Sequence, residues 1–394
     1  MKTFALILTF LTCCAFGAAA VDFNKGAASS ANYYTVIAYD FSKGVPIIEV
    51  TINGKKRRFM MDTGAMTAIS GELSSEMKLK IKASIDVGDS GGHQGVMSVV
   101  ILPEVDLGGV LFKSIPAVVM EKSFFSTCLG IDGVIGSNLL RNSIIQFSAS
   151  ARTITLTDQG EKLSLQSQAG IEMELNTPQS NPFIHIRFGA GDPGELVQFD
   201  SGSNGFYDLS SRAYEQRFKP TGLFVERYAA GGSGSMGIHG NEAYHVKYKL
   251  KIPELVIDGY TFRNISVNTN ATAISRIGAS LLNYGLVTVD YKHKRFYFQP
   301  VTSTDLPSPD RLQKSWPLDF VPVGTGLAVG TVWNPELKNS VAEGDELIRF
   351  GDLDFTQVNL CDLLGGLKYQ QDTARVVLRD ARTKALKELQ LIRD

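Results

Sequence analysis

Phe59-Met60-Met61-Asp62-Thr63-Gly64 and Val197-Gln198-Phe199-Asp200-Ser201-Gly202 are two copies of one pattern, a short apolar run that ends in Asp-(Thr/Ser)-Gly. The two aspartates lie 200 − 62 = 138 residues apart. In such a pattern a buried strand fixes the backbone, the glycine permits a sharp turn beside the carboxylate, and the hydroxyl can bond across to the other copy. The pattern predicts that Asp62 and Asp200 face each other.

The two motifs belong to a long internal repeat. The other matched segments are 45–50 with 181–186, 102–108 with 252–258, 136–140 with 278–282, and 153–156 with 295–298. Both copies consist of short apolar or alternating runs broken by turn residues such as Asn53-Gly54 and Asp258-Gly259, which is typical of β-hairpins. Short helices are expected after residues 136 and 278 and at 211–218. The chain is therefore predicted to be mainly β, with one lobe at 35–160 and a pseudo-twofold related lobe at 165–300.

Two carboxylates that face each other at close range can share one proton. Like charge raises the pKa of one of them, so the pair titrates as a unit with one group neutral and the other ionised. The ionised group can take a proton from water while the neutral group polarises a carbonyl, which is general acid–base catalysis without a metal or a cofactor. Asp62 and Asp200 are the predicted catalytic residues, and the predicted supporting residues are Thr63, Gly64, Ser201 and Gly202.

The motifs, together with Val134-Ile135-Gly136 downstream of the first one, resemble those of retropepsin-like and pepsin-like aspartic peptidases. The resemblance covers about residues 35–300, and the compact halves look like a fused duplicate of a retropepsin-like subunit. It implies two lobes of the acid-protease β-barrel fold, endopeptidase activity and a polypeptide substrate. Two departures fall in the second half: Arg276-Ile277-Gly278 replaces two apolar residues before the glycine, and the loop after Asp200 is longer.

In that family glycine-rich hairpins close over the substrate, and two segments are candidates here. They are 88–95, with Gly91 and Gly92, and 230–240, with Gly232 and Gly234; ordinary exposed loops are the alternative. The first segment carries a third copy of the motif letters, Asp89-Ser90-Gly91, without an apolar run before it. The matching position in the second half, 89 + 138 = 227, holds Arg227. We therefore expect Asp89 to be a solvated loop residue that takes no part in catalysis.

A third unit follows a predicted linker at 301–317, which is rich in proline and serine. It covers 318–394 and resembles a PDZ domain of the bacterial type, a small α+β fold. The residues predicted to form its carboxylate-binding loop are Gly326, Leu327, Ala328 and Val329. The resemblance implies that the adjacent strand accepts a peptide or protein ligand by β-augmentation. The alternative is a unit that packs on the lobes with an occluded groove.

The first twenty residues have the layout of a secretory signal peptide. Lys2 precedes an apolar run at 4–16, and Ala18-Ala19-Ala20 offers small residues for cleavage before Val21. The run is too short to span a bilayer, so we expect export to the periplasm or the outside, with no stable membrane insertion. A lipoprotein anchor at Cys13 or Cys14 is the minority alternative, because neither follows a small residue.

Several other classes are excluded or disfavoured. The net charge is −1 with no basic stripe, which argues against nucleic acid as a partner, and the five histidines lack metal-ligand spacing. Gly88 to Gly92 spells a serine-protease signature, but the first histidine of the chain, His93, follows Ser90, which is the wrong order for that fold. Cys128 and Cys361 lie far apart and are predicted to be buried free thiols.

One alternative from a different functional class stays open. The protein could be a secreted peptide-binding protein on a peptidase scaffold whose catalysis has been lost. Arg276, near the core of the second lobe, favours this alternative, whereas the presence of both aspartates opposes it.

Overall fold

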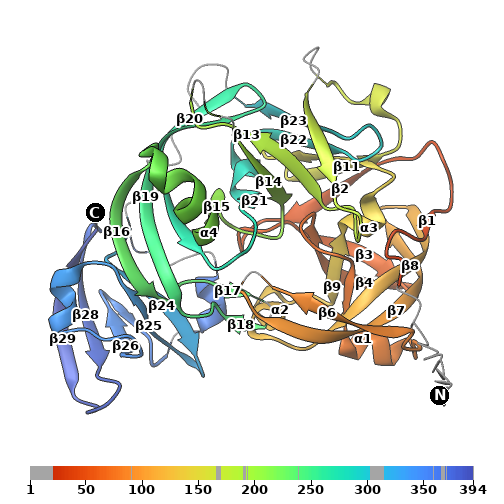
Figure 1. Ribbon diagram of the computed structural model, residues 1–394. Helices are drawn as coiled ribbons and strands as arrows, with labels where there is room; N and C mark the ends of the chain where they lie inside the picture. Colours follow the sequence, from red (N-terminus) through yellow and green to blue (C-terminus); the bar gives the residue numbers. More distant parts are fainter. Residues whose placement is uncertain are drawn as a thin grey trace, which may run out of the picture.

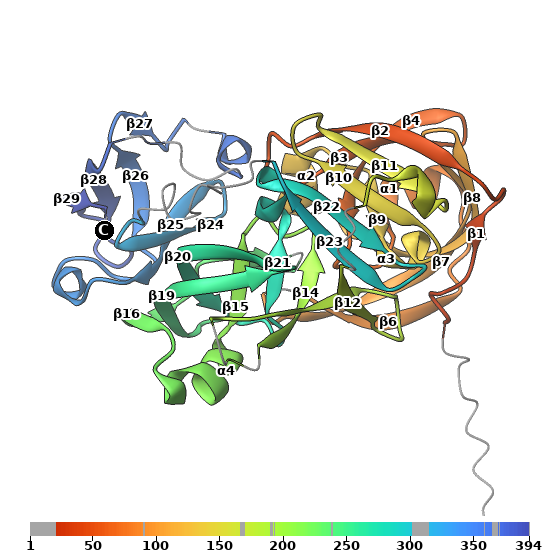
Figure 2. The ribbon, with the colours of Figure 1, turned by 90° about the horizontal axis from the view of Figure 1, so that it is seen from above.

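The computed structural model describes residues 21–89, 91–165, 170–189, 192, 194–237, 239–301, 315–357, 359–364, 369 and 371–393. The predicted signal peptide at 1–20, with both lipoprotein candidates, and most of the predicted linker lie outside the described residues. Two β-lobes pack side by side, and a C-terminal unit lies against the second of them (Figures 1 and 2).

The first lobe is built from hairpins around the apolar run that leads to Asp62. Its strands are β2 (Tyr34–Asp40), β3 (Ile47–Ile52), β4 (Lys55–Asp62), β5 (Ala68–Ser70), β6 (Ala83–Gly88), β7 (Gln94–Leu107), β8 (Val110–Met120), β9 (Gly133–Gly136), β10 (Ile144–Ser148) and β11 (Thr153–Thr157), with β1 (Ala27–Ala28) added to β8. Its helices are α1 (Gly71–Glu76), α2 (Phe124–Leu129) and α3 (Ser137–Leu140). Asn53 and Gly54 join β3 to β4 with φ of 50° and 71°, the backbone that the Asn-Gly pair favours in a tight hairpin turn.

The second lobe repeats the same order of elements. Its strands are β12 (Ile171–Leu175), β13 (Pro182–Ile186), β14 (Glu195–Asp200), β15 (Tyr207–Ser210), β16 (Val225–Gly232), β17 (Met236–Gly237), β18 (Gly240–Asn241), β19 (His245–Ile257), β20 (Tyr260–Asn270), β21 (Arg276–Gly278), β22 (Gly285–Asp290) and β23 (Arg295–Pro300). The predicted short helices are present as α3, η4 (Ala279–Asn283), and α4 (Ser211–Ala213) continued by η2 (Tyr214–Phe218).

The lobes are joined by one antiparallel sheet with the strand order β2-β11-β10-β22-β23-β12. At its centre Gln146 of β10 pairs with Thr288 of β22, and 288 − 146 = 142 is the offset of the later repeat segments. Each half therefore meets its own copy at the middle of this sheet, which places a pseudo-twofold axis there. The predicted mainly β fold with two repeat-related lobes is confirmed.

One hydrophobic core runs through both lobes. The ring of Phe199, just before the second motif, contacts Phe147 of the first lobe and Phe296 of the second, with ring centroids 6.5 Å and 5.1 Å apart. All three side chains are fully buried. Burying such a side chain stabilises the fold by roughly 1.5–3 kcal/mol, so the strand that leads to Asp200 is anchored in the hydrophobic core.

The C-terminal unit has its own small core, which includes Leu347, Phe350, Val376 and Leu378. Its elements are β24 (Leu318–Val323), β25 (Gly326–Val332), η6 (Pro335–Asn339), β26 (Glu346–Phe350), β27 (Leu353–Asp354), η7 (Leu360–Leu363), β28 (Thr373–Arg379) and β29 (Leu386–Ile392).

The four residues predicted to form a carboxylate-binding loop lie instead in strand β25. A two-residue turn at Gly324-Thr325 closes a β24–β25 hairpin before them, so the backbone is already extended at Gly326. Leu327 and Ala328 pair with β24 on one edge and with β26 on the other. In this arrangement no edge of β25 is free at these positions to accept a peptide.

The prediction of two free thiols is wrong, because Cys128 and Cys361 form a disulfide with their Cα atoms 4.6 Å apart. The sequence separation of 233 residues hid this pairing, which arises because η7 of the C-terminal unit packs on α2 of the first lobe. Lys43 of the first lobe also donates to the carbonyl of Cys361 at 2.8 Å. The C-terminal unit is thus fixed covalently to the first lobe.

Candidate active site

Asp62 and Asp200 stand at equivalent places, each at the carboxyl end of a buried strand. Asp62 ends β4, which runs parallel to β9, and Asp62 pairs with Gly136. Asp200 ends β14, which runs parallel to β21, and Asp200 pairs with Gly278. Both aspartates are nearly buried, with 9% and 6% of their surface exposed, so the strands present both carboxyls at one protected point between the lobes.

The residues after the two aspartates lock the lobes together through four reciprocal hydrogen bonds. Thr63 Oγ1 donates to the carbonyl of Phe199 at 2.7 Å, and Ser201 Oγ donates to the carbonyl of Met61 at 2.8 Å. Each hydroxyl oxygen also accepts the backbone N–H of the other residue, at 3.0 Å in both directions. Thr63 and Ser201 are fully buried, so these bonds fix the relative position of the two motifs in the way the sequence predicted.

The two glycines are required because each lies against the carboxylate of the opposite lobe. A Cβ atom on Gly64 would lie 2.4 Å from Cγ of Asp200, and one on Gly202 would lie 2.3 Å from Cγ of Asp62. Each glycine N–H also donates to the aspartate of its own motif, at 2.8 Å for Gly64 and 3.0 Å for Gly202. Because neither glycine has a side chain, each carboxyl has room to lie against the opposite motif.

Burial raises the pKa of Asp62 well above its ordinary value, and the charge of Asp200 and a hydrogen bond between the two carboxyls raise it further. The N–H of Gly64 and the charge of Arg276 act in the opposite direction but do not outweigh burial. These surroundings favour the neutral form of Asp62, and a neutral carboxyl can donate a proton in acid–base catalysis.

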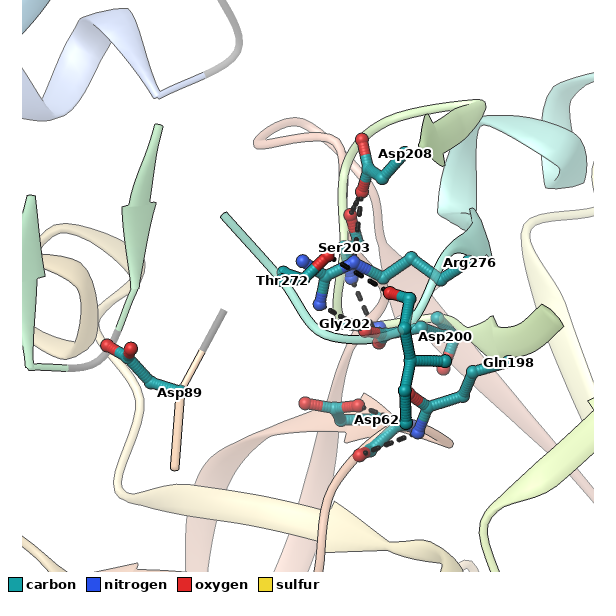
Figure 3. Close-up of polar contacts among 12 residues, drawn as sticks. Asp62, Asp89, Gln198, Asp200, Gly202, Ser203, Asp208, Thr272 and Arg276 are labelled. Atoms are coloured by element: carbon teal, nitrogen blue, oxygen red, sulfur yellow. Dashed lines mark hydrogen bonds and ion pairs between the residues drawn. The ribbon is translucent and has the colours of Figure 1, made fainter. Parts of the chain in front are cut away.

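Arg276 reaches the pair from β21, as Figure 3 shows. Its Nη1 donates to Oδ2 of Asp200 at 3.1 Å, and its Nε donates to Oδ2 of Asp208 at 3.2 Å. Asp208 is held in turn by the hydroxyl of Ser203 at 2.5 Å. The departure seen in the sequence is thus a cation bonded directly to one of the two predicted catalytic carboxylates.

Residues 48–139, the part of the first lobe that contains Asp62, match the family model described as Aspartyl protease. The first lobe matches the aspartyl protease family. A solved structure described as the crystal structure of aspartic proteinase from Irpex lacteus aligns at 11% identity and a TM-score of 0.41, covering 69% of this chain and 99% of that chain. No curated protein gives a significant match.

The two hairpins predicted as flaps extend from the first and the second lobe, and their tips touch. Gly91 and Gly92 lie at the tip between β6 and β7, and Gly232 and Gly234 lie where β16 leaves its hairpin with β19. The carbonyl of Gly91 accepts the N–H of Ala243 at 2.9 Å, which joins the two tips.

Asp89 is bonded rather than freely solvated, contrary to the expectation from the sequence. Its Oδ1 accepts the N–H groups of Gly91 and His93, both at 2.9 Å, and its Oδ2 accepts the N–H of His239 on the other hairpin at 2.9 Å. It stands apart from Asp62 and Asp200 (Figure 3). Asp89 therefore shapes the tip of one hairpin and ties it to the other; Ser90 lies outside the described residues.

Two polar residues of the second lobe that the sequence did not single out bind the Asp62 loop of the first lobe. Nδ2 of Asn181 and Nε2 of Gln198 both donate to the carbonyl of Gly64, at 2.7 Å and 3.0 Å. Asn138 plays a similar part within the first lobe, since its Oδ1 accepts the N–H of Thr67 at 2.8 Å. All three residues lie within the repeated segments, which pointed to a role near the motifs, but only the folded structure gives their partners.

Two further features were searched for in the structure: a metal-binding cluster and a membrane-spanning helix. Among the described residues, no cluster of three or more His, Cys, Asp or Glu side chains is arranged to hold a metal ion. Within the same part of the chain, no helix is long and apolar enough to cross a membrane.

Proposed function

We propose that this protein is an aspartic endopeptidase that hydrolyses peptide bonds with a water molecule activated between Asp62 and Asp200. The observation that carries the proposal is the symmetric pair itself, with both carboxyls buried and each lying against the glycine of the opposite motif. The raised pKa of Asp62 supports it, because a neutral and a charged carboxyl side by side can act as acid and base.

The meeting flap tips support a polypeptide substrate bound in extended form. Hairpins such as β6–β7 and β16–β19 carry backbone N–H and C=O groups that can pair with an extended chain. A chain that passes between the lobes is cut internally, which is endopeptidase action.

The direct test is cleavage of denatured protein substrates by the wild type and by Asp62→Asn. The matched control is Asp352→Asn, since Asp352 is exposed on the C-terminal unit. We expect cleavage by the wild type and the control and none by Asp62→Asn. Equal cleavage by Asp62→Asn and the wild type would reject the proposal.

The second candidate is a peptide-binding protein that has lost catalysis, and Arg276 is the observation that favours it. A guanidinium bonded to Oδ2 of Asp200 occupies one of the two oxygens through which that carboxylate could take a proton from water. In this case peptides would bind with equal affinity to the wild type and to Asp62→Asn, and no preparation would cleave them at any pH.

We also propose export and a PDZ-like C-terminal unit. The Cys128–Cys361 disulfide supports export, because such bonds persist in oxidising compartments outside the cytoplasm. The strand–helix content of residues 318–393 and their separate core support the PDZ-like assignment. N-terminal sequencing of the exported protein tests the first proposal, with Val21 as the expected first residue.

A further inference from the structure

The surroundings of the two carboxyls differ in the number of donors that each receives. Asp200 accepts three: Gly202 N–H at 3.0 Å and Ser203 N–H at 3.2 Å on Oδ1, and Arg276 at 3.1 Å on Oδ2. Among the described backbone groups, Asp62 accepts the N–H of Gly64 alone. Donors to a carboxylate favour its charged form, and a guanidinium does so most strongly because it carries a full charge that it cannot lose.

Arg276 cannot turn away easily, because it is held on both sides. Strand β21 lies between β14 and β15, and Arg276 pairs with Gln198 on one and with Asp208 on the other. Its side chain is 14% exposed, and Asp208 accepts its Nε while Asp200 accepts its Nη1. The fork of the guanidinium is thus used to bridge a structural and a predicted catalytic carboxylate.

We propose that Arg276 is the positioning residue that fixes Asp200 as the charged member of the pair and leaves the shared proton on Asp62. The inference rests on the proposed function and deepens it by giving each carboxyl its role. Asp200 takes a proton from the attacking water as the water oxygen bonds to the peptide carbon, while Asp62 gives its proton to the carbonyl oxygen. When the C–N bond breaks, Asp200 returns its proton to the leaving nitrogen and Asp62 regains one from the diol, so the pair ends as it began.

The sign of the pH effect follows from the charges around Arg276. The charged and titratable groups that face it or the pair are Asp62, Asp200, Asp208, Tyr291 and, beyond Ser275, Glu195. The positive charge favours ionisation of the nearby carboxyls, so the pair reaches its active, singly charged state at lower pH with Arg276 than without it. Both limbs of the activity profile should therefore move to higher pH when the arginine is removed.

The test variant copies the first lobe. Val134 and Ala68 occupy the places that correspond to Arg276 and Asp208, so Arg276→Val with Asp208→Ala installs an apolar pair that the fold already uses. It removes the cation together with Asp208, so that the charge of Asp208 is not left without its partner. The control is Arg295→Met, because Arg295 is part of an exposed ion pair with Glu172 at 3.8 Å.

We expect the kcat/KM profile of the double variant to move to higher pH by on the order of one unit, with no movement in the control. Arg276→Lys should keep the profile of the wild type and lower kcat, because the charge remains but the fork that orients Asp200 is lost. A folded, active double variant with an unshifted profile would overturn the inference.

A second measurement needs no turnover. Carboxyl ¹³C resonances of Asp62 and Asp200, assigned by their loss in the two Asn variants, should show a neutral Asp62 and a charged Asp200 in weakly acidic solution. The opposite assignment would overturn the inference even in a protein that cleaves well. A protein that cleaves nothing would instead refute the proposed function, while these resonances would still report the charge of each group.

Discussion

In both lobes three neighbouring strands lie beside the aspartate, but the residues paired across them are apolar in the first lobe and polar in the second. In the first lobe Val134 of β9 sits between Met60 and Ala68, and all three are buried and apolar. In the second lobe the corresponding row is Gln198, Arg276 and Asp208, three polar side chains that each form hydrogen bonds. One lobe supports its aspartate by packing, and the other supports it by charge.

The β6–β7 hairpin of the first lobe and the β16–β19 hairpin of the second lobe also differ in the contacts that they make. The tip of the first contacts the second hairpin, whereas the second also joins the C-terminal unit, where Gly232 pairs with Thr331 and Ser233 N–H donates to the carbonyl of Gly330 at 2.9 Å. Nδ2 of Asn241 donates to the carbonyl of Pro322 at 2.7 Å. Figure 1 shows β16 and β19 lying beside β24 and β25. The comparison teaches that a duplicated fold can keep its motifs and strand order symmetric while the side chains and contacts beside the motifs differ.

The largest expected effect comes from replacing either aspartate of the pair. Asp62→Asn and Asp200→Asn should each lower turnover by at least about 10³-fold, since each removes one part of a shared acid–base function. Only Asp200→Asn should also lower the free energy of unfolding, by on the order of 1–3 kcal/mol, because it leaves part of the Arg276 charge uncompensated. Steady-state kinetics and denaturant unfolding of both variants measure this; equal stabilities would contradict the asymmetry.

The two motif glycines, Gly64 and Gly202, should respond equally to substitution. Gly64→Ala and Gly202→Ala each place a Cβ within 2.4 Å of the opposite carboxyl carbon, so both should displace a carboxyl and reduce turnover by about 100-fold. The control is Gly71→Ala, because a Cβ there would meet nothing within 4 Å. If one glycine tolerated alanine and the other did not, the two halves would not be equivalent at the pair.

The disulfide ties the C-terminal unit to the first lobe alone, so its loss sharpens the comparison between the lobes. Cys128→Ser with Cys361→Ser should reduce the free energy of unfolding by about 2–4 kcal/mol while short peptides are still cleaved. Reducing agent should produce the same loss in the wild type and none in the double variant. A double variant as stable as the oxidised wild type would show that the bond does not stabilise the fold.

Hydrogen exchange should separate the two hairpins. Removing residues 315–394, together with Cys128→Ser to avoid a free thiol, should speed amide exchange at 225–233 more than at 83–88. Among the described residues, the hydrogen bonds between a hairpin and the C-terminal unit come from the second hairpin. Mass spectrometry of exchanged peptides gives both rates in one experiment. Equal acceleration of the two segments would mean that the C-terminal unit supports them jointly.

The smallest expected effect is at the tip of the first hairpin, between β6 and β7. Asp89→Ala should raise KM by a modest factor, about two- to fivefold, with little change in kcat, because it removes the bond to His239 without touching the pair. Asp86→Ala, exposed on the same hairpin, is the control. Ser90→Ala should likewise keep the catalytic step. Loss of single-turnover cleavage in Ser90→Ala, with Asp62→Asn active, would favour a serine mechanism.

The sequence by itself determined the repeat, the mainly β lobes and the identity of the two aspartates. These features depend on order along the chain: an apolar run, an acid, a hydroxyl and a glycine specify a strand end and a tight turn wherever they occur. The repeat then requires the two strand ends to meet, and the reciprocal bonds of Thr63 and Ser201 agree with that requirement.

Only the tertiary structure decided how the surroundings of the two aspartates differ. Arg276 meets Asp200 across 76 residues, and Cys128 meets Cys361 across 233, because of strand register and unit packing that no local pattern encodes. A shift of one residue in β21 would turn Arg276 to the other face and remove the ion pair. The pairing of β25 was also decided by the tertiary structure. A two-residue turn lets β24 pair with the edge of β25 that the sequence analysis had expected to accept a peptide.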